Sequence, residues 1–514
     1  MGHTRVCSLE ISVEYLNAHF YSQEFRSNES VLAACGYNRS TIESLSEKIN
    51  CGATPKDVVY ESSGCGLIRT SDVRPNCFFA DKVLRTQRLN LTQGSATAAI
   101  TGDVLYTMSG TIGYAATIPA GCKEVFSFSN TIARARIRKD KNSDSHYISA
   151  FFNSSFGYLQ SRRLVSGGIQ GHVMPNPFKK LLVITPHALA QKYIGDKVRQ
   201  AERLSTFANS IAVHLIERFS LRDHIQAFRT SKNHQCSTRN LASERLDAPF
   251  YLPEHIELRK ALQCESAVPL GTYCQLVAER WKKSELDFLY FEIGSLDVGS
   301  GRITPTKTKT RNAASRAQRL LKQWDVLVST VRPNRKNVGF VTQGNAEGIP
   351  LVASTGFAVL RFQDKETAAF FHSWLRSDVA TQQLVQWNAG GSYPTIEEEV
   401  VPRILVPAFS ANTIREIGRK CIAGIQARDL TANLCNAAKL LVEALIERKI
   451  TEDELIHAQT RLEQGDDSAD RAILSRLFEG GWDATETRPL FPDLDAYYET
   501  LRMVEREQTE AAAK

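Results

Sequence analysis

The chain carries the same series of short motifs twice, and this duplication constrains its fold more than any other feature. The clearest pairs are LNAHFY at 16–21 with LDAPFY at 246–251, GDVL at 102–105 with WDVL at 324–327, and AFFNS at 150–154 with AFFHS at 369–373. Eight such matches follow in one order, with offsets of 219 to 230 residues. Chance explains one or two matches but not an ordered series. The 514-residue chain is therefore a tandem duplication over roughly 1–220 and 232–450, followed by an unduplicated tail.

Each half follows one plan, in which a long helix follows a β-rich module. Short β-branched runs between Gly, Pro and Asn turns predict the strands, and apolar residues spaced by three and four predict helices from about 188 to 219 and from about 413 to 448. The residues expected on the helix seam, and as the spacer and partner interface, are Leu204, Ala208, Ile211, Leu215, Leu434, Leu441 and Leu445.

Two long seamed helices can bury their apolar stripes on each other. We therefore predict an α+β fold, in which two β-rich modules related by a pseudo-two-fold axis are joined by an antiparallel coiled-coil spacer. The alternative is two independent domains with ordinary core helices. The predicted segments are a first module at 1–187, a first helix and linker at 188–231, a second module at 232–410, a second helix at 411–450 and an acidic helical tail at 451–514.

The charge is unevenly distributed along the chain. The net charge is +7, but residues 451–514 hold 7 basic and 16 acidic residues, so the tail carries −9 and residues 1–450 carry +16. A large basic body favours a polyanion as partner. The tail, with predicted helices near 451–464, 468–479 and 494–508, reads either as a protein-docking element or as a helical cap on the second long helix.

No sequence motif points to catalysis or to a metal. The 11 cysteines include no C-x-x-C pair, so we expect reduced thiols, no zinc site and a cytoplasmic protein. No G-x-x-x-x-G-K-[ST] or H-E-x-x-H run occurs, and no apolar stretch reaches the roughly 18 residues of a membrane helix. Asp103 and Asp325 recur in both halves, which favours a turn or cap role over a catalytic carboxylate.

These features together resemble the DNA-specificity (S) subunit of Type I restriction-modification systems. The resemblance rests on the GDVL and SGTIG runs at 102–113, on the GGIQG segment at 167–171, on LDAPFY at 246–251 and above all on the two-module plan. It covers about 1–450. The chain departs from the family pattern in its second copy, where SGTIG is replaced by VRPNRKNVG at 331–339, and in its 64-residue acidic tail.

The resemblance implies a cytoplasmic prokaryotic protein without catalytic residues. Each module would be a target-recognition domain that reads half of a split DNA site, and the helices would set the distance between the halves. The implied partners are double-stranded DNA, two copies of an adenine methyltransferase and a restriction (motor-nuclease) subunit, within a phage-defence complex. The chain itself would bind no cofactor, since S-adenosylmethionine would belong to the methyltransferase, and ATP and Mg to the motor subunit.

DNA contacts in the second module are expected from two basic segments. The first is hydroxyl-rich and holds Lys307, Lys309 and Arg311; the second is a loop of Arg332, Asn334, Arg335, Lys336 and Asn337. Arg and Asn are the side chains that read guanine and adenine with paired hydrogen bonds. The alternatives are a solvated loop with a helix start and an ordinary basic hairpin.

In the first module we expect contacts from a predicted strand and from a glycine-rich loop. Arg134, Arg136 and Arg138 alternate with apolar residues, so a strand would place all three on one face. That face could instead pair with carboxylates. The loop ends in Gln170 and His172, which could approach DNA closely or simply close a tight turn.

Two other functions remain open. A stand-alone methyltransferase or nuclease would need a cofactor loop or catalytic motif, and none is recognisable, so this chain alone should not bind S-adenosylmethionine. A scaffold or DNA-binding subunit of another methylation-linked defence system, with little sequence specificity, is the second alternative, and the acidic tail is its main support. Salt-dependent DNA binding without a preferred sequence would favour the scaffold.

Overall fold

The computed structural model describes residues 18–513 apart from 56–57, 62, 79, 81–82, 88–96, 167–170, 219–243, 265, 300, 345–347 and 392. The chain divides into two compact units, one of Met1–Ser205 with Asp429–Lys514 and the other of Thr206–Arg428. Each unit therefore holds one module and part of each long helix. This division differs from the five predicted segments because the boundary between the units falls inside both helices.

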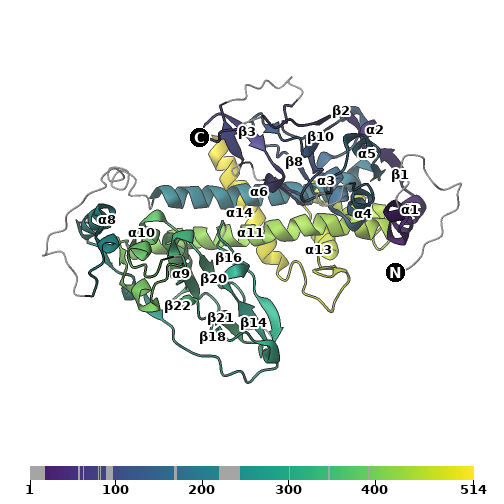
Figure 1. The fold of residues 1–514 in the computed structure, drawn as a ribbon. Coiled ribbons are helices and arrows are strands. Elements are labelled where there is room, and N and C mark those ends of the chain that lie inside the picture. Colours follow the sequence, from purple (N-terminus) through teal and green to yellow (C-terminus); the bar gives the residue numbers. More distant parts are fainter. Residues whose placement is uncertain are drawn as a thin grey trace. The chain divides into compact units, whose positions relative to one another are not determined.

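The first module combines short strands with helices (Figure 1). Its strands are β1 Asn38–Thr41, β2 Ser46–Cys51, β3 Cys65–Ile68, β4 Val73–Arg74, β5 Cys77–Phe78, β6 Leu84–Thr86, β7 Val104–Thr107, β8 Ala115–Thr117, β9 Ser127–Phe128, β10 Ile132–Ile137 and β11 Leu182–Thr185. Its helices are α1 Gln23–Ala34, α2 Ile42–Leu45, α3 Ser145–Asn153, α4 Ser155–Arg163 and α5 Pro175–Lys179. The main sheets have the orders β2-β10-β7-β8 and β6-β3-β9.

The second module repeats this arrangement. Its strands are β12 Val268–Pro269, β13 Cys274–Leu276, β14 Asp287–Phe291, β15 Leu296–Asp297, β16 Arg302–Ile303, β17 Thr306–Lys309, β18 Ala317–Leu320, β19 Val326–Ser329, β20 Val338–Phe340, β21 Leu351–Ser354, β22 Phe357–Phe362 and β23 Leu405–Val406. Its helices are α8 Pro253–Cys264, α9 Lys365–Leu375 and α10 Asp378–Gln386. The sheets run β13-β22-β19-β20-β16-β15 and β17-β14-β21-β18.

The strand orders confirm the duplication at the level of the fold. The order β2-β10-β7-β8 has its counterpart in β13-β22-β19-β20, and β6-β3-β9 in β17-β14-β21. Helices α3 and α9 also begin alike, because the side chains of Asp144 and Asp364 each accept hydrogen bonds from the first-turn amides. The paired phenylalanines of both helices, at 151–152 and 370–371, are fully buried.

A long helix follows each module, as the sequence predicts. Helix α6 spans Ala188–Arg218 with 31 residues, and α11 spans Ala411–Ile446 with 36 residues. Inside the second unit, Arg428 donates to the Ala208 carbonyl at 3.2 Å, and Gly424 lies against Ile211. Since residue numbers rise along one helix as they fall along the other, the helices pack antiparallel there. Inside the first unit, Thr431 donates to the Ala201 carbonyl at 3.3 Å.

The predicted seam residues lie in this helix packing. Leu204, Ala208, Leu434, Leu441 and Leu445 are buried, and Ile211 is half-buried. The side chain of Leu215 lies outside the described residues. The buried seam side chains are used within the chain itself, so a partner that docks on the helices must use their other faces.

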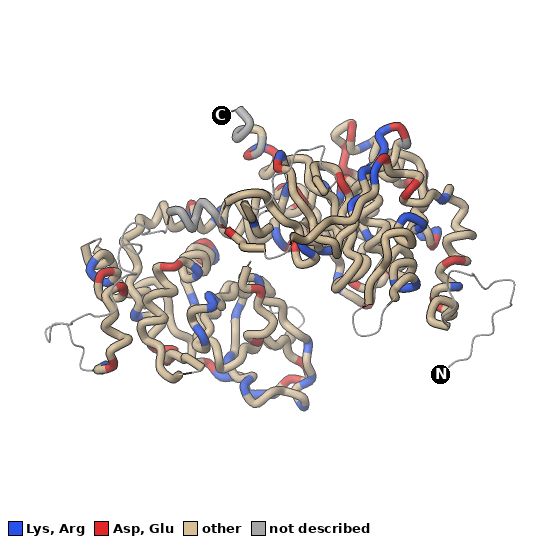
Figure 2. Tube along the Cα trace, turned by 45° about the horizontal axis from the view of Figure 1, so that its top comes forward, with Lys and Arg blue, Asp and Glu red and all other residues tan. Residues whose placement is uncertain are grey.

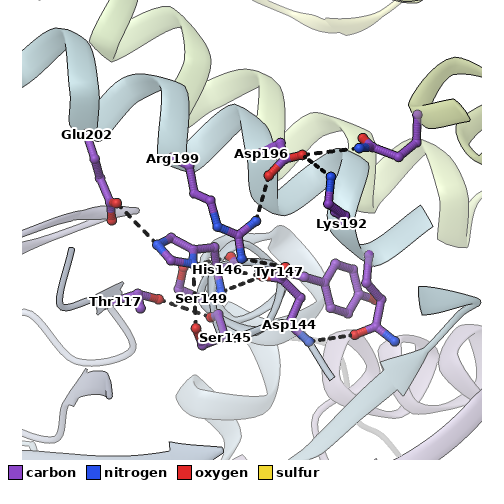
Figure 3. Close-up of polar contacts among 12 residues, drawn as sticks. Thr117, Asp144, Ser145, His146, Tyr147, Ser149, Lys192, Asp196, Arg199 and Glu202 are labelled. Atoms are coloured by element: carbon purple, nitrogen blue, oxygen red, sulfur yellow. Dashed lines mark hydrogen bonds and ion pairs between the residues drawn. The ribbon is translucent and has the colours of Figure 1, made fainter. Parts of the chain in front are cut away.

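A polar cluster fixes α6 to the first module (Figure 3). The Asp144 carboxylate accepts hydrogen bonds from two backbone amides of α3 and pairs with Arg199 of α6 at 2.6 Å. Arg199 also reaches Asp196 at 2.8 Å, and His146 lies 3.2 Å from Glu202. Gly195 permits this close approach, since a Cβ atom at that position would lie 2.6 Å from an Asp144 oxygen.

The acidic tail folds into α12 Glu452–Glu463, α13 Ser468–Leu474, the short strands β24 Leu477–Phe478 and β25 Gly481–Trp482, and α14 Leu494–Ala513. A capping box of Thr451 and Glu454 starts the first of these helices. Asn433 of α11 donates to the Leu490 carbonyl at 2.6 Å. The tail thus packs on the long helices, which supports the helical-cap interpretation.

The tail is joined to α6 by a buried ion pair. The Lys197 ammonium lies 2.7 and 2.8 Å from the two Asp470 oxygens, and both side chains are at most 1% exposed. The hydroxyls of Tyr193 and Tyr498 donate to the same carboxylate, at 2.5 and 2.6 Å. Burial and the neighbouring carboxylate raise the pKa of both tyrosines, so both remain protonated donors. We name these four residues the tail latch.

The tail latch yields a first prediction. Lys197→Met leaves the Asp470 charge buried without its cation, which costs about 3–5 kcal/mol. The loss should appear as faster amide hydrogen exchange in α13 and α14, because local opening is measured without assuming that the whole chain unfolds in one step.

The matched control is the double variant Lys197→Met/Asp470→Asn. Its amide still accepts from a tyrosine but carries no charge, so most of the protection should return. Equal exchange in the single and double variants would show that the ion pair does not hold the tail.

Candidate nucleic-acid interface

The two modules contain the same ion pair between an aspartate and an arginine. In the first module Asp103 accepts two hydrogen bonds from Arg136, at 2.7 and 2.8 Å. In the second module Asp325 accepts two from Arg361, at 2.8 and 2.7 Å. Both aspartates are 1% exposed. The hydrogen bonds that the guanidinium groups donate to the carboxylates raise the pKa of both arginines, so both arginines remain charged. We call each pair a module clamp.

Each clamp aspartate also closes a turn, which confirms the role predicted from its recurrence. Asp103 accepts from the amide of Ile100 at 2.9 Å, and Asp325 accepts from the amide of Lys322 at 2.8 Å. The turn leads directly into β7 or β19, and the arginine lies on β10 or near the end of β22. The clamp therefore ties the strand that leads into the loop described below to its neighbour in the sheet.

The three arginines of β10 do not form a DNA-binding face, so this prediction is wrong for Arg134. That side chain is fully buried and donates to the Ala98 carbonyl at 2.9 Å, to Asn50, and to the clamp residue Asp103 at 3.5 Å. Burial lowers its pKa. Arg136 is used by the clamp, so the alternative of carboxylate pairing holds for this strand. Arg138 follows the strand and is exposed, with one hydrogen bond to the Ser46 carbonyl at 2.9 Å.

The basic loop of the second module joins β19 to β20. Its start is held by the Thr330 amide, which donates to the Gly356 carbonyl at 2.9 Å, and its end by the Ser329 amide, which donates to the Asn337 carbonyl at 2.9 Å. Arg332 has a φ of +50° and lies over the ring of Tyr393, 4.3 Å from its centroid. The backbone of the loop is therefore held at both ends, and the Arg332 guanidinium stacks on Tyr393 at its start.

The side chains of this loop are presented differently. Asn334 and Arg335 are exposed on a 3₁₀ turn, Pro333–Arg335. Lys336 has a φ of +56° and pairs with Asp378 at the start of α10, at 2.7 Å. Asn337 is only 8% exposed, so its predicted base contact is wrong for this conformation. Asn334 and Arg335 are the groups of the loop best placed to reach a base edge.

The second basic segment is an edge strand rather than the start of a helix. Strand β17 lies at the end of its sheet, with β14 as its one neighbour among the strands that the structure describes. Lys307 and Lys309 share one face of the strand and are exposed. Arg311 follows on the 3₁₀ turn Thr310–Asn312 and is also exposed. The three cations form one basic ridge, Lys307–Arg311.

The first module has a loop in the equivalent place. Isolated backbone β-bridges join His172 to Ser109 and to Ser166. In the second module the same kind of bridge joins Thr395 to Val331 and to Ala389. His172 is exposed. Gln170 lies outside the described residues. The same scaffold therefore carries a neutral SGTIG loop in one module and a cationic loop in the other.

Sequence reasoning missed two residues of this region. Arg361 could have been found, because it lies at the same offset from Arg136 as other duplicated positions do. Tyr393 gave only a weak signal, an aromatic residue after two glycines, and its exposed fraction is 68%. A large exposed ring beside an arginine is a surface on which a base or sugar can stack.

Neither a metal-ligand cluster nor a membrane-spanning helix occurs among the residues that the structure describes. The His, Cys, Asp and Glu residues among them form no group of three or more that could hold a metal ion. Within the same residues, no helix combines the length and hydrophobicity that a bilayer crossing requires.

Comparison with known proteins finds likeness among solved structures alone. No family model matches the sequence, and no curated protein matches it. One similar structure is the Type I restriction-modification S subunit of M. genitalium, with 15% identity, a TM-score of 0.40, and coverage of 81% of this chain and 96% of that one. Another is the HsdS subunit of Thermoanaerobacter tengcongensis, with 14% identity, a TM-score of 0.27, and coverage of 81% and 97%.

The module clamps yield a second prediction. Asp325→Asn removes the charge from a buried hydrogen-bonded pair and should cost the second module about 1.5–3 kcal/mol. Amide hydrogen exchange should speed up in β19 and β22 and stay unchanged in β7 and β10. Asp103→Asn is the corresponding variant of the first module and should give the reverse pattern, with a larger effect because Asp103 also pairs with the buried Arg134 at 3.5 Å. Loosening of both modules by either variant would show that the clamps are not independent.

Proposed function

We propose that this chain is a non-catalytic DNA-recognition subunit of a Type I restriction-modification system or of a related phage-defence complex. One observation carries the proposal. Two copies of one fold, each held by its own clamp, present loops of different chemistry at the same place. Two such modules suit the reading of a bipartite site, one half per module, because the loops supply base contacts while the scaffold stays constant.

The long helices support a role as spacer and docking element. Their seam is buried, so the length of the pair does not depend on a partner, and a fixed length would set the separation of the two half-sites. Their other faces remain for two methyltransferase subunits. In this assembly S-adenosylmethionine belongs to the methyltransferase, and ATP with Mg to a motor-nuclease subunit. The expected location is the cytoplasm of a prokaryote.

The residues proposed for DNA contact are the predicted ones that the fold leaves exposed or half-buried, together with Gln170, which lies outside the described residues. In the second module they are Lys307, Lys309, Arg311, Arg332, Asn334, Arg335 and Lys336, and in the first they are Arg138, His172 and Gln170. Phosphate contacts would come from the ridge and base contacts from the loop. The alternative is a scaffold or DNA-binding subunit with little sequence specificity, in which the surface of the acidic tail that faces away from the long helices would dock a partner.

The composition of the native complex tests the function. The chain should be isolated from its source cells at its natural level and the mass of the complex determined. We expect two copies of an adenine methyltransferase per chain, and a bipartite methylated motif in the genomic DNA. A chain that is isolated alone, or without a methyltransferase, would contradict the proposal.

The loop yields a third prediction, read from the methylated motif. Arg335→Lys keeps the positive charge but removes the planar fork that reads guanine, so one half of the motif should relax. Asn334→Ala should relax the same half, and each lost base contact should cost about 1–3 kcal/mol. The other half of the motif is the internal control. An unchanged motif in both variants would exclude this loop as a reader.

A further inference from the structure

The two modules differ strongly in the charge of one duplicated segment. Residues 302–344 of the second module hold 10 basic residues and one acidic residue, Asp325. The corresponding residues 77–122 of the first module hold 3 basic and 2 acidic residues. The excess of positive charge is therefore 9 in one copy and 1 in the other. Figure 2 shows basic segments along the outer strands and loops of the second module.

The contrast holds at a single equivalent position. On strand β3, Gly66 is the register partner of Arg85 on β6. Two residues further along β3, Ile68 is the partner of Phe128 on the parallel strand β9. On strand β14, Leu289 is likewise the register partner of Lys307 on β17. Two residues further along β14, Phe291 is the partner of Ala353 on the parallel strand β21. Arg85 and Lys307 thus occupy the same place in the two modules.

These two cations have different surroundings. Arg85 is neutralised by Glu124 through two hydrogen bonds, at 2.6 and 2.8 Å. Lys307 is exposed, and no carboxylate of the described residues lies within ion-pair distance of it or of Lys309 and Arg311. Other arginines of the first module are likewise engaged, since Arg163 pairs with Glu29 at 2.8 Å and Arg136 belongs to the clamp.

We propose that the second module supplies most of the phosphate contacts of the DNA complex, through the basic ridge Lys307–Arg311. This inference rests on the proposed function. Lysines on an open edge strand also discourage pairing with another sheet, so the experiment must separate DNA contact from that structural role.

The salt dependence of DNA binding measures this asymmetry. Each phosphate contact contributes about 0.9 to the slope of log Kobs against log salt, and this contribution does not depend on base sequence. Loss of three contacts should lower the slope by about 2.7. When salt rises from 50 to 200 mM, the affinity of the unmodified complex should therefore fall by about 40-fold more than the affinity of a variant that lacks the three contacts.

The experiment uses the full chain with its co-purified partners and a random-sequence DNA duplex. The test variant is Lys307→Gln/Lys309→Gln/Arg311→Gln. The matched control removes three exposed cations of the first module, Arg39→Gln/Lys123→Gln/Lys139→Gln. We expect the slope to fall by about 2.7 in the test variant and by less than 1 in the control. Equal slopes in the two variants, or an unchanged slope in the test variant, would overturn the inference.

A variant that is expected to add a phosphate contact provides a second test, because misfolding would not increase the salt dependence of binding. Glu124→Gln frees Arg85 from its carboxylate, so the slope should become steeper by about 0.9. A slope that stays unchanged would show that the place of Arg85 and Lys307 is not a phosphate site. If the unmodified complex does not bind the duplex at all, the proposed function fails rather than the asymmetry.

Discussion

Helix α6 pairs charged side chains with two different parts of the chain, one pair fully buried and one partly buried, and these pairs fix how the first unit packs. Lys197 meets Asp470 of the tail, and Arg199 meets Asp144 of the module. A buried charge without its partner is destabilising, so a shift of either part along the helix would raise the free energy of the folded chain. The apolar seam favours packing in general, and the ion pairs select one register.

The duplication, the two modules and the long helices could be predicted from sequence. Ordered matches reveal a repeat, and apolar residues at helical spacing reveal a helix, because both signals extend over many residues. Burial within one strand could not be predicted. Arg134 and Arg138 share the same alternating pattern, and only the residues packed across from β10 bury the first and leave the second exposed.

Only the local part of the candidate interface could be predicted from the sequence, because contacts between distant residues leave no pattern in it. A local run such as residues 331–337 announces its charge in the sequence, but Tyr393 lies far along the chain and joins Arg332 only in the fold. The backbone of Asn337 closes the hairpin, which turns its side chain inward although its residue type suits base reading. The partner of the acidic tail was also hidden, because pairing of Lys197 with Asp470 spans 273 residues.

The module clamps separate what must stay constant from what can vary. Each clamp joins the start of the strand that leads into the loop to the neighbouring strand, and it uses no atom of the loop itself. The two copies in this chain have already diverged to SGTIG and VRPNRKNVG above the same clamp. Replacement of one loop therefore leaves the clamp of its own module and the whole of the other module unchanged. The surface chemistry of the two modules can diverge independently, one loop at a time.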